Sequence, residues 1–243
     1  MSYHIKKGFT LAEVLITLGI IGVVAAMTIP NMITKFTKNI VEVRLKEDYS
    51  IFQQVIQFAE YNDLSLEVDL PNDNLNAIKE FYQTYIAPNT KVPTVCFNEA
   101  GCWHAKNPTK NLAGATAYYN VTGVGVGADI LAMRLNNGSN VIIDAYGSSS
   151  IYNYFGVKIT EPSTVIVMID ANGDSAPNMI GKDIYPYVFT SRGILPAGYD
   201  MTKDEIDRNC STTSSSQNAG YFCSAKVIND GWAITDAVWK RKS

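Results

Sequence analysis

Oxygen-bearing side chains alternate along one short stretch of this chain, DANGDSAPNMIGKD. Asp170, Asn172 and Asp174 occupy every second position around a glycine, and such side chains can wrap a hard cation such as calcium. The stretch departs from an EF-hand loop, because Ser175 stands where that loop has glycine and no bidentate glutamate closes it. A polar turn after a strand uses the same residue types. The sequence therefore leaves two interpretations open, a calcium site and a plain turn.

The four cysteines form two pairs that are local in the sequence. Cys96 and Cys102 lie in CFNEAGC, and Cys210 and Cys223 enclose a longer serine-rich stretch. Of the three pairings that four cysteines allow, this spacing favours two short disulfide loops in an exported domain. The alternative is a metal site built from Cys96, Cys102 and His104, for which no fourth ligand is visible nearby.

Other kinds of chemistry find little support. The two histidines, His4 and His104, have no obvious nucleophile beside them, and no Gly-x-Ser-x-Gly elbow is present. The segment GVGVGA superficially fits a dinucleotide fingerprint, but a predicted hairpin follows it in place of the required helix. A net charge of −3 gives no electrostatic reason to expect nucleic acid. We therefore expect neither an enzyme nor a nucleic-acid-binding protein.

The longest apolar run lies near the N-terminus, from Phe9 to Ile29. As a helix with a rise of about 1.5 Å per residue, it can cross the roughly 30 Å hydrocarbon core of a bilayer. Its single carboxylate, Glu13, lies in the first turns. A secretory signal peptide is shorter and is discarded. Because this run continues directly into a second helical pattern, we expect a retained span, although small residues at 25–27 leave ordinary signal cleavage open.

The second pattern, residues 31–62, places apolar side chains at intervals of three and four, which is typical of an amphipathic helix. Pro30 removes one backbone donor and should kink the helix without ending it, because the pattern resumes at once. We therefore expect one helix over 9–61, with its first half, 9–29, in the membrane. Polar residues after position 61 end it.

The remaining residues, 62–243, are enough for one globular domain. Up to about residue 115 the sequence indicates loops, with a short helix over 74–86. Residues 130–146 are typical of a β-hairpin that turns at Asn137 and Gly138.

The last part of the chain carries further signals. Residues 163–174 predict a β-branched strand that runs into a polar turn. Residues 202–210 predict a helix capped by Thr202, followed by a surface loop at 211–216 and a last apolar segment at 225–234. The predicted fold class is α+β, with a long N-terminal helix packed on an antiparallel sheet.

Several N-terminal positions form one pattern. A short basic leader, residues 1–7, precedes Gly8 and Phe9, and Glu13 and Pro30 follow within one apolar frame. This pattern resembles the N-terminus of type IV pilins and of the pseudopilins of type II secretion systems. The resemblance implies that a prepilin peptidase cuts after Gly8, that the amine of Phe9 is methylated, and that Glu13 and Pro30 are assembly residues.

The strong resemblance covers little more than the N-terminal helix. Beyond it, the family usually has an antiparallel sheet packed on the helix and often a C-terminal disulfide, which Cys210 and Cys223 would suit. Some pseudopilins bind calcium in their C-terminal loops, which favours Asp170, Asn172 and Asp174 as calcium ligands. We expect no cofactor, and calcium at this loop is the one alternative that stays open.

The resemblance implies a structural subunit of a type IV pilus or a type II secretion pseudopilus. Residues 1–8 would be the leader, 9–61 the helix and 62–243 the exported domain. The alternative is a pilin-anchored surface adhesin or a substrate-binding minor pilin. Expected partners are the prepilin peptidase, other pilin or pseudopilin subunits, the inner-membrane assembly machinery and membrane lipid. The precursor is expected to span the cytoplasmic (inner) membrane once, and the assembled filament to be at the cell surface or in the periplasm.

The same segment raises two questions about packing and charge. Gly22 and Ala26 form one small-xxx-small pair that could favour helix association, although membrane helices are commonly rich in such residues. Cleavage after Gly8 would create a cationic amine on Phe9, four residues before Glu13. That pair could form within one chain or between neighbouring subunits, and the resemblance favours the second.

Overall fold

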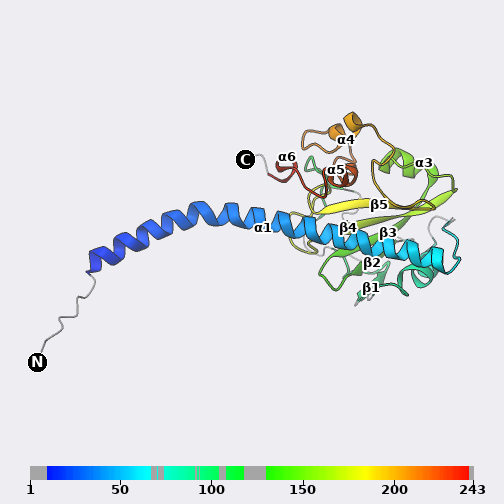
Figure 1. Ribbon diagram of the computed structural model, residues 1–243, viewed down its shortest axis with the longest axis horizontal. Helices are drawn as coiled ribbons and strands as arrows, with labels where there is room; N and C mark the ends of the chain where they lie inside the picture. Colours follow the sequence, from blue (N-terminus) through cyan, green and yellow to red (C-terminus); the bar gives the residue numbers. More distant parts are fainter. Residues whose placement is uncertain are drawn as a thin grey trace, which may run out of the picture. The chain divides into compact units, whose positions relative to one another are not determined.

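A single long helix begins the folded chain. The structure is a computed structural model that describes residues 10–66, 70, 74–90, 92, 94–103, 108–117 and 130–240. The chain divides into two compact units, residues 1–39 and 40–243. Helix α1 (Leu11–Tyr61) begins in the first unit, continues through Pro30 and ends in the second (Figure 1). The expected continuation of the helix past the proline is confirmed.

The second unit is built on one antiparallel sheet. Its six strands pair in chain order, each with the next, so that the sheet is a simple meander. Such a topology needs only tight turns or loops between neighbouring strands. The strands are β1 (Thr94–Phe97), β2 (Ile130–Arg134), β3 (Asn140–Gly147), β4 (Ser163–Asp170), β5 (Ile184–Thr190) and β6 (Gly193–Pro196).

Short helices connect and follow these strands. Before the sheet lie α2 (Leu75–Phe81) and the π-helical turn η1 (Tyr82–Ile86). Between β3 and β4 lie α3 (Ser148–Ser150) and the π-helical turn η2 (Ile151–Phe155). After the sheet come α4 (Lys203–Asn209), α5 (Cys223–Asn229) and α6 (Asp236–Trp239).

Both faces of the sheet are buried. One face packs on the second half of α1, residues 40–61, where Leu45, Phe52 and Val55 belong to the same core as Val167 of β4 and Tyr187 of β5 (Figure 1). Alternate strand residues form a second core on the other face, which η2 and loop segments cover. Since β4 is buried on both sides, its sequence reads as a continuous apolar run.

The predicted α+β class, with a long N-terminal helix and an antiparallel sheet, is confirmed. The hairpin turn is also confirmed: the amide of Gly138 donates to Leu135, and Gly138 has a φ of 90°, which favours glycine. Thr202 caps α4 as expected and forms a full capping box with Glu205.

Other expectations need correction. The loop-rich interpretation of residues 62–115 was wrong at 94–97, which form edge strand β1 and pair with β2. Strands β5 and β6 were not predicted, and the start of the last apolar segment belongs to helix α5. In each case the secondary structure is determined by tertiary pairing or packing, because the short segment does not specify it alone.

One carboxylate of α1 lies inside the body. Asp48 has no exposed surface, and its Oδ1 accepts a hydrogen bond of 2.7 Å from Nδ2 of Asn137 in the β2–β3 turn. Burial disfavours the charged form and raises the pKa of Asp48 to about 6, against the opposing effect of hydrogen bonds from Ser139 and Asn137. The folded protein therefore binds this proton more tightly than the unfolded chain.

This tight proton binding gives a pH-dependent prediction for Asp48→Asn. A neutral carboxyl favours folding at about pH 4 and below, and this contribution is lost as the pH rises through about 6. The asparagine keeps an acceptor for Asn137 but never ionises. We expect the variant to be more stable than the wild type by about 2–3 kcal/mol at pH 7, and nearly equal at pH 4.

Denaturant unfolding at both pH values would measure the two differences. The control is Glu47→Gln, which neutralises the exposed neighbouring carboxylate and should follow the wild-type profile closely. A stability difference for Asp48→Asn that is the same at both pH values would contradict the assigned pKa.

Candidate functional site

The first turn of α1 contains one acidic side chain, Glu13, which hydrogen bonds hold in place. Oε2 of Glu13 accepts hydrogen bonds from the backbone N–H of Thr10 (2.8 Å) and from its hydroxyl (2.9 Å). In return, the N–H of Glu13 donates to the Thr10 hydroxyl oxygen at 3.2 Å. This reciprocal arrangement is a capping box, which satisfies donors that the first helical turn leaves without intrahelical partners.

Sequence reasoning identified Glu13 but missed Thr10. The signal was present, since a threonine three residues before a glutamate at the start of an apolar helix is the capping-box pattern. Gly8 and Phe9, the expected processing residues, lie outside the described residues.

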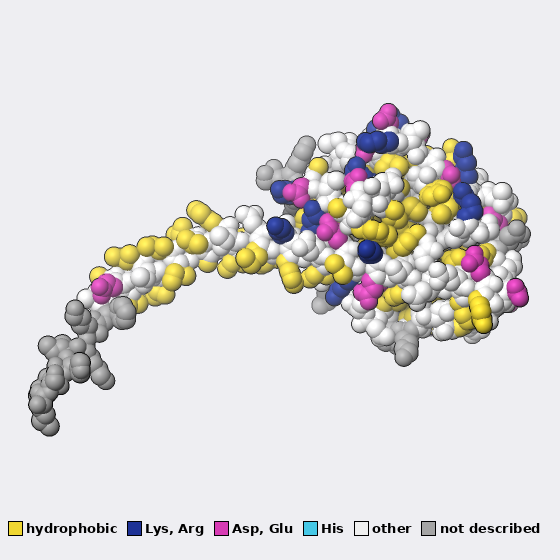
Figure 2. Space-filling view, viewed as in Figure 1, with side chains coloured by type: hydrophobic (Ala, Val, Ile, Leu, Met, Phe, Trp, Pro, Cys, Tyr) yellow, Lys and Arg dark blue, Asp and Glu magenta, His cyan; other side chains and the backbone are white. Residues whose placement is uncertain are grey.

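The first half of α1 exposes apolar side chains on every side that Figure 2 shows. It is a helix long and apolar enough to cross a membrane, and none of its most apolar stretch is buried. Its hydroxyls bond to the helix's own carbonyls: Thr17 donates to Glu13 (2.9 Å) and Thr28 to Val24 (2.9 Å). These bonds remove the cost of placing hydroxyl groups in hydrocarbon.

The small residues of this segment also lie on the open surface. A Cβ added at Gly22 would meet no atom within 4 Å, and Ala26 is exposed. Pro30 lies inside the helix and is exposed as well. These positions are open to contact with other helices.

The polar loop between β4 and β5 is largely buried. Asp170 and Asp183 have no exposed surface, and Asn172 is nearly as buried. Asp170 accepts a hydrogen bond from the N–H of Asn172 at 3.2 Å, and Asp183 accepts from the N–H groups of Asn178 (2.8 Å) and Met179 (2.7 Å). The two carboxylates thus help to shape the loop.

Asp174 has a different environment from the other expected calcium ligands. Its carboxylate is half-exposed, pairs with Arg134 at 2.8 Å and accepts a hydrogen bond of 3.0 Å from Nδ2 of Asn140. Among the described residues, no group of three or more His, Cys, Asp or Glu side chains is arranged to hold a metal ion. A cation in this loop would therefore need amide or backbone oxygens in addition to carboxylates.

The electrostatics of this loop favour a positive charge. Burial, and then the negative charge of Asp183, raise the pKa of Asp170 well above its usual value. Burial also raises the pKa of Asp183 to about 7, although backbone hydrogen bonds from Met179 and Asn178 oppose the shift. Side-chain oxygens of Asn172 and Asn178 are buried without a hydrogen-bond partner in the described structure. These oxygens and carboxylates have the chemistry of calcium ligands.

Two disulfides are present, Cys96–Cys102 and Cys210–Cys223. The second lies beside the loop between β4 and β5. Gly220 has a φ of 95°, and a Cβ there would lie 2.4 Å from the carbonyl oxygen of Ile180. Only a glycine allows this close approach of the two loops.

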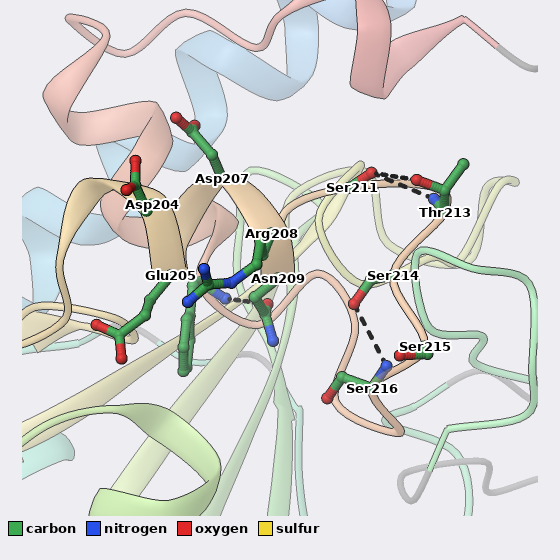
Figure 3. Close-up of a pocket in the computed structure, with 11 residues that line it drawn as sticks. Asp204, Glu205, Asp207, Arg208, Asn209, Ser211, Thr213, Ser214, Ser215 and Ser216 are labelled. Carbon is green, nitrogen blue, oxygen red and sulfur yellow. Dashed lines mark hydrogen bonds between the residues drawn. The ribbon is translucent and has the colours of Figure 1, made fainter.

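A groove of about 860 Å³ lies between α4 and the serine-rich loop (Figure 3). Hydrogen bonds from Lys203 and Lys226 lower the pKa of Asp207 to about 2, so this carboxylate is an ion-pair partner and a poor base. The opposite wall bonds to itself, as in the contact between the hydroxyls of Ser211 and Thr213 (2.9 Å). Neither histidine nor cysteine is among the described residues that line this groove.

Together, these features define a chain with an apolar N-terminal helix that is long enough to cross a membrane and a disulfide-bonded α+β body. Residues 4–29 match the family described as the prokaryotic N-terminal methylation motif, which is the signature of type IV pilins and pseudopilins. No curated protein and no solved structure matches the chain. The match supports a type IV pilin-like or pseudopilin subunit with a structural role, and with the apolar helix it fits an inner-membrane-anchored precursor.

The disulfides give a stability prediction. The Cys210–Cys223 bridge spans 13 residues in sequence and the Cys96–Cys102 bridge spans 6. On loop entropy alone, replacing Cys210 and Cys223 by alanine should cost about 3 kcal/mol, and replacing Cys96 and Cys102 by alanine about 2 kcal/mol. Denaturant unfolding under non-reducing conditions measures both, and each double variant serves as the control for the other.

Peptide mapping without reductant should recover only these two pairs from the wild type. Free thiols or crossed pairs in that map would contradict the prediction.

Proposed function

We propose that this chain is a structural subunit of a type IV pilus or of a type II secretion pseudopilus, processed after Gly8 and assembled through α1. The observation that carries the proposal is the methylation motif at residues 4–29, placed on a helix whose first half is apolar and exposed. The second half of that helix belongs to the core of the body, so that force on the helix is transmitted to the folded domain.

Glu13 is the residue through which α1 would recognise a neighbouring subunit. A charge at the bilayer centre costs about 2.5–3.5 kcal/mol or more, and Glu13 lies near the helix end, where the cost is smaller. Its bonds to Thr10 hold the carboxylate at the helix start. The amine that cleavage creates on Phe9 of a neighbouring subunit would neutralise this charge, and the distance between the two groups would select the axial stagger of the helices.

The proposed partners follow from this processing. The prepilin peptidase would remove residues 1–8 at the cytoplasmic face, and the inner-membrane machinery would then extract the subunit from lipid. Other pilin or pseudopilin subunits would cover the apolar side chains of α1, which replaces lipid contact by helix packing.

Replacing Glu13 tests the inter-subunit role. We expect Glu13→Ala and Glu13→Val to insert in the membrane and to be cleaved normally, but to block assembly, because the neighbouring amine loses its partner. Thr17→Val is the control: it removes another polar group one turn later, whose hydroxyl bonds only within its own helix. The measurements are the yield of sheared filaments and the mass of the mature N-terminus, which should carry a methylated Phe9.

Two results would contradict the proposed processing and assembly. Normal filament yield from Glu13→Ala, expressed as the only copy, would rule out the inter-subunit pair. A mature terminus near residue 28 would instead identify an ordinary signal peptide.

We further propose that the loop between β4 and β5 binds calcium through Asp170, Asn172 and Asp183. Support comes from the burial of both carboxylates, their mutual repulsion and the unpartnered Oδ1 of Asn172. A divalent cation would relieve the repulsion and supply the missing partner. Asp174 adds negative charge nearby, while its carboxylate bonds to Arg134 and Asn140.

Melting with calcium and with chelator tests this site. Calcium at about one hundred times its dissociation constant should stabilise the wild type by about 2.7 kcal/mol. Asp183→Asn and Asp170→Asn should lose this calcium-dependent shift, because each removes one of two buried charges. Asp174→Asn should retain the shift while losing the ion pair to Arg134. Identical wild-type melting in the two buffers would leave the plain polar turn.

A further inference from the structure

A second cleft, of about 710 Å³, lies on the face of the sheet away from α1. Three segments that are distant in sequence line it: residues 111–117, the end of β3 with η2, and residues 217–221. It has no part in the membrane helix, in the candidate cation loop or in the groove beside α4. Its size is that of an ordinary small-ligand site.

One wall of the cleft is a connected set of aromatic rings. The ring of Tyr146 meets Tyr154 at 6.4 Å and Phe155 at 5.3 Å, both edge-on, and Phe155 meets Tyr221 at 5.3 Å. Phe155 and Tyr221 are buried, whereas Tyr154 is 47% exposed. Tyr154 is joined to the buried rings through the half-buried Tyr146, so a ligand that stacks on Tyr154 meets a ring whose neighbours are already packed.

The other wall presents side-chain amides. Nδ2 of Asn111 donates to the carbonyl of Gln217 at 3.0 Å, and the N–H of Leu112 donates to Ala219 at 3.0 Å, so that the two segments are bound together. The side-chain amides of Gln217 and Asn218 form no hydrogen bond with any residue that the structure describes. Each can both donate and accept. This wall is therefore held by the Asn111 side chain and by backbone contacts, and the amides of Gln217 and Asn218 are left for a ligand.

The charge of the lining selects among ligands. No aspartate, glutamate, lysine or arginine is among the described residues that line the cleft. An anionic or cationic ligand would lose its hydration without gaining a counter-charge. A wholly apolar ligand would bury the amides without partners, which also costs free energy. A neutral ligand with both C–H faces and many hydroxyls avoids both costs.

We propose that this cleft binds a neutral oligosaccharide. The C–H face of one pyranose ring would stack on Tyr154, and its hydroxyls would bond to the amides of Gln217 and Asn218 and to the hydroxyl of Thr116. The inference concerns the body of the chain alone and does not depend on filament assembly. It assigns to the body of the chain a binding site for neutral, hydroxyl-rich ligands.

The test uses the purified full-length chain in detergent on an array of neutral and acidic oligosaccharides, followed by titration with the best neutral glycan found. Tyr154→Ala removes the stacking ring and should weaken that affinity by roughly tenfold or more. Gln217→Ala should weaken it as well. The matched control is Tyr152→Ala, two residues earlier in η2, whose ring is similarly exposed but lies against Lys158 outside the cleft.

The outcomes separate clearly. Binding of neutral glycans that is lost in Tyr154→Ala and kept in Tyr152→Ala supports the proposal. Binding of acidic glycans only, binding that survives Tyr154→Ala, or no binding on the array overturns it. Filament yield, measured in parallel, should be unchanged in Tyr154→Ala, so that a failure of glycan binding is distinguished from a failure of the subunit role.

Discussion

A single helix has to satisfy two different surroundings, and the rest of the structure depends on how it does so. Residues 11–39 of α1 expose apolar side chains, and their hydroxyls bond to the helix's own carbonyls. Residues 40–61 keep one apolar stripe, of which Leu45, Phe52 and Val55 are buried against the sheet. The change of pattern occurs within one continuous helix, α1.

The polar contacts of the second half determine where α1 lies on the sheet. Gln53 donates to the carbonyl of Ile194 at 3.1 Å, Glu42 accepts from the N–H of Ile234 at 2.8 Å, and Asp48 bonds to Asn137. These contacts reach β6, the C-terminal segment and the β2–β3 turn. Apolar packing tolerates a small shift of the helix, whereas a buried carboxyl or amide that loses its partner does not. The burial of Asp48 therefore specifies one register of helix on sheet, at a cost in stability above its pKa.

The sequence was sufficient where a signal is local. The long helix, the hairpin turning at Asn137 and Gly138, and the cap of α4 all follow from side-chain period and turn chemistry. Strand β5 was missed because Pro186 lies inside it, between Tyr185 and Tyr187, and proline is uncommon inside paired strands. Edge strand β1 has only four residues, and its extended conformation depends on pairing with β2. The burial of Asp170 beside Asp183 and the aromatic cleft could not be predicted. Each depends on segments that only the folded sheet brings together.

The C-terminal loops of the body are held together by backbone contacts, a disulfide and close approaches at glycine. Residues 110–112 run between two irregular segments: Lys110 exchanges backbone hydrogen bonds with Asn178 and Ile180, and Leu112 bonds to Ala219. One strand-like piece thus connects the polar loop after β4 with the loop that Cys210–Cys223 closes. These loops lack the regular backbone pairing of the sheet, so the disulfide and single backbone bonds limit their freedom alongside the burial of Leu112 and Ile180. Three backbone hydrogen bonds thus join the polar loop to the segment that carries the amide wall of the aromatic cleft, so that the two surfaces belong to one hydrogen-bonded region.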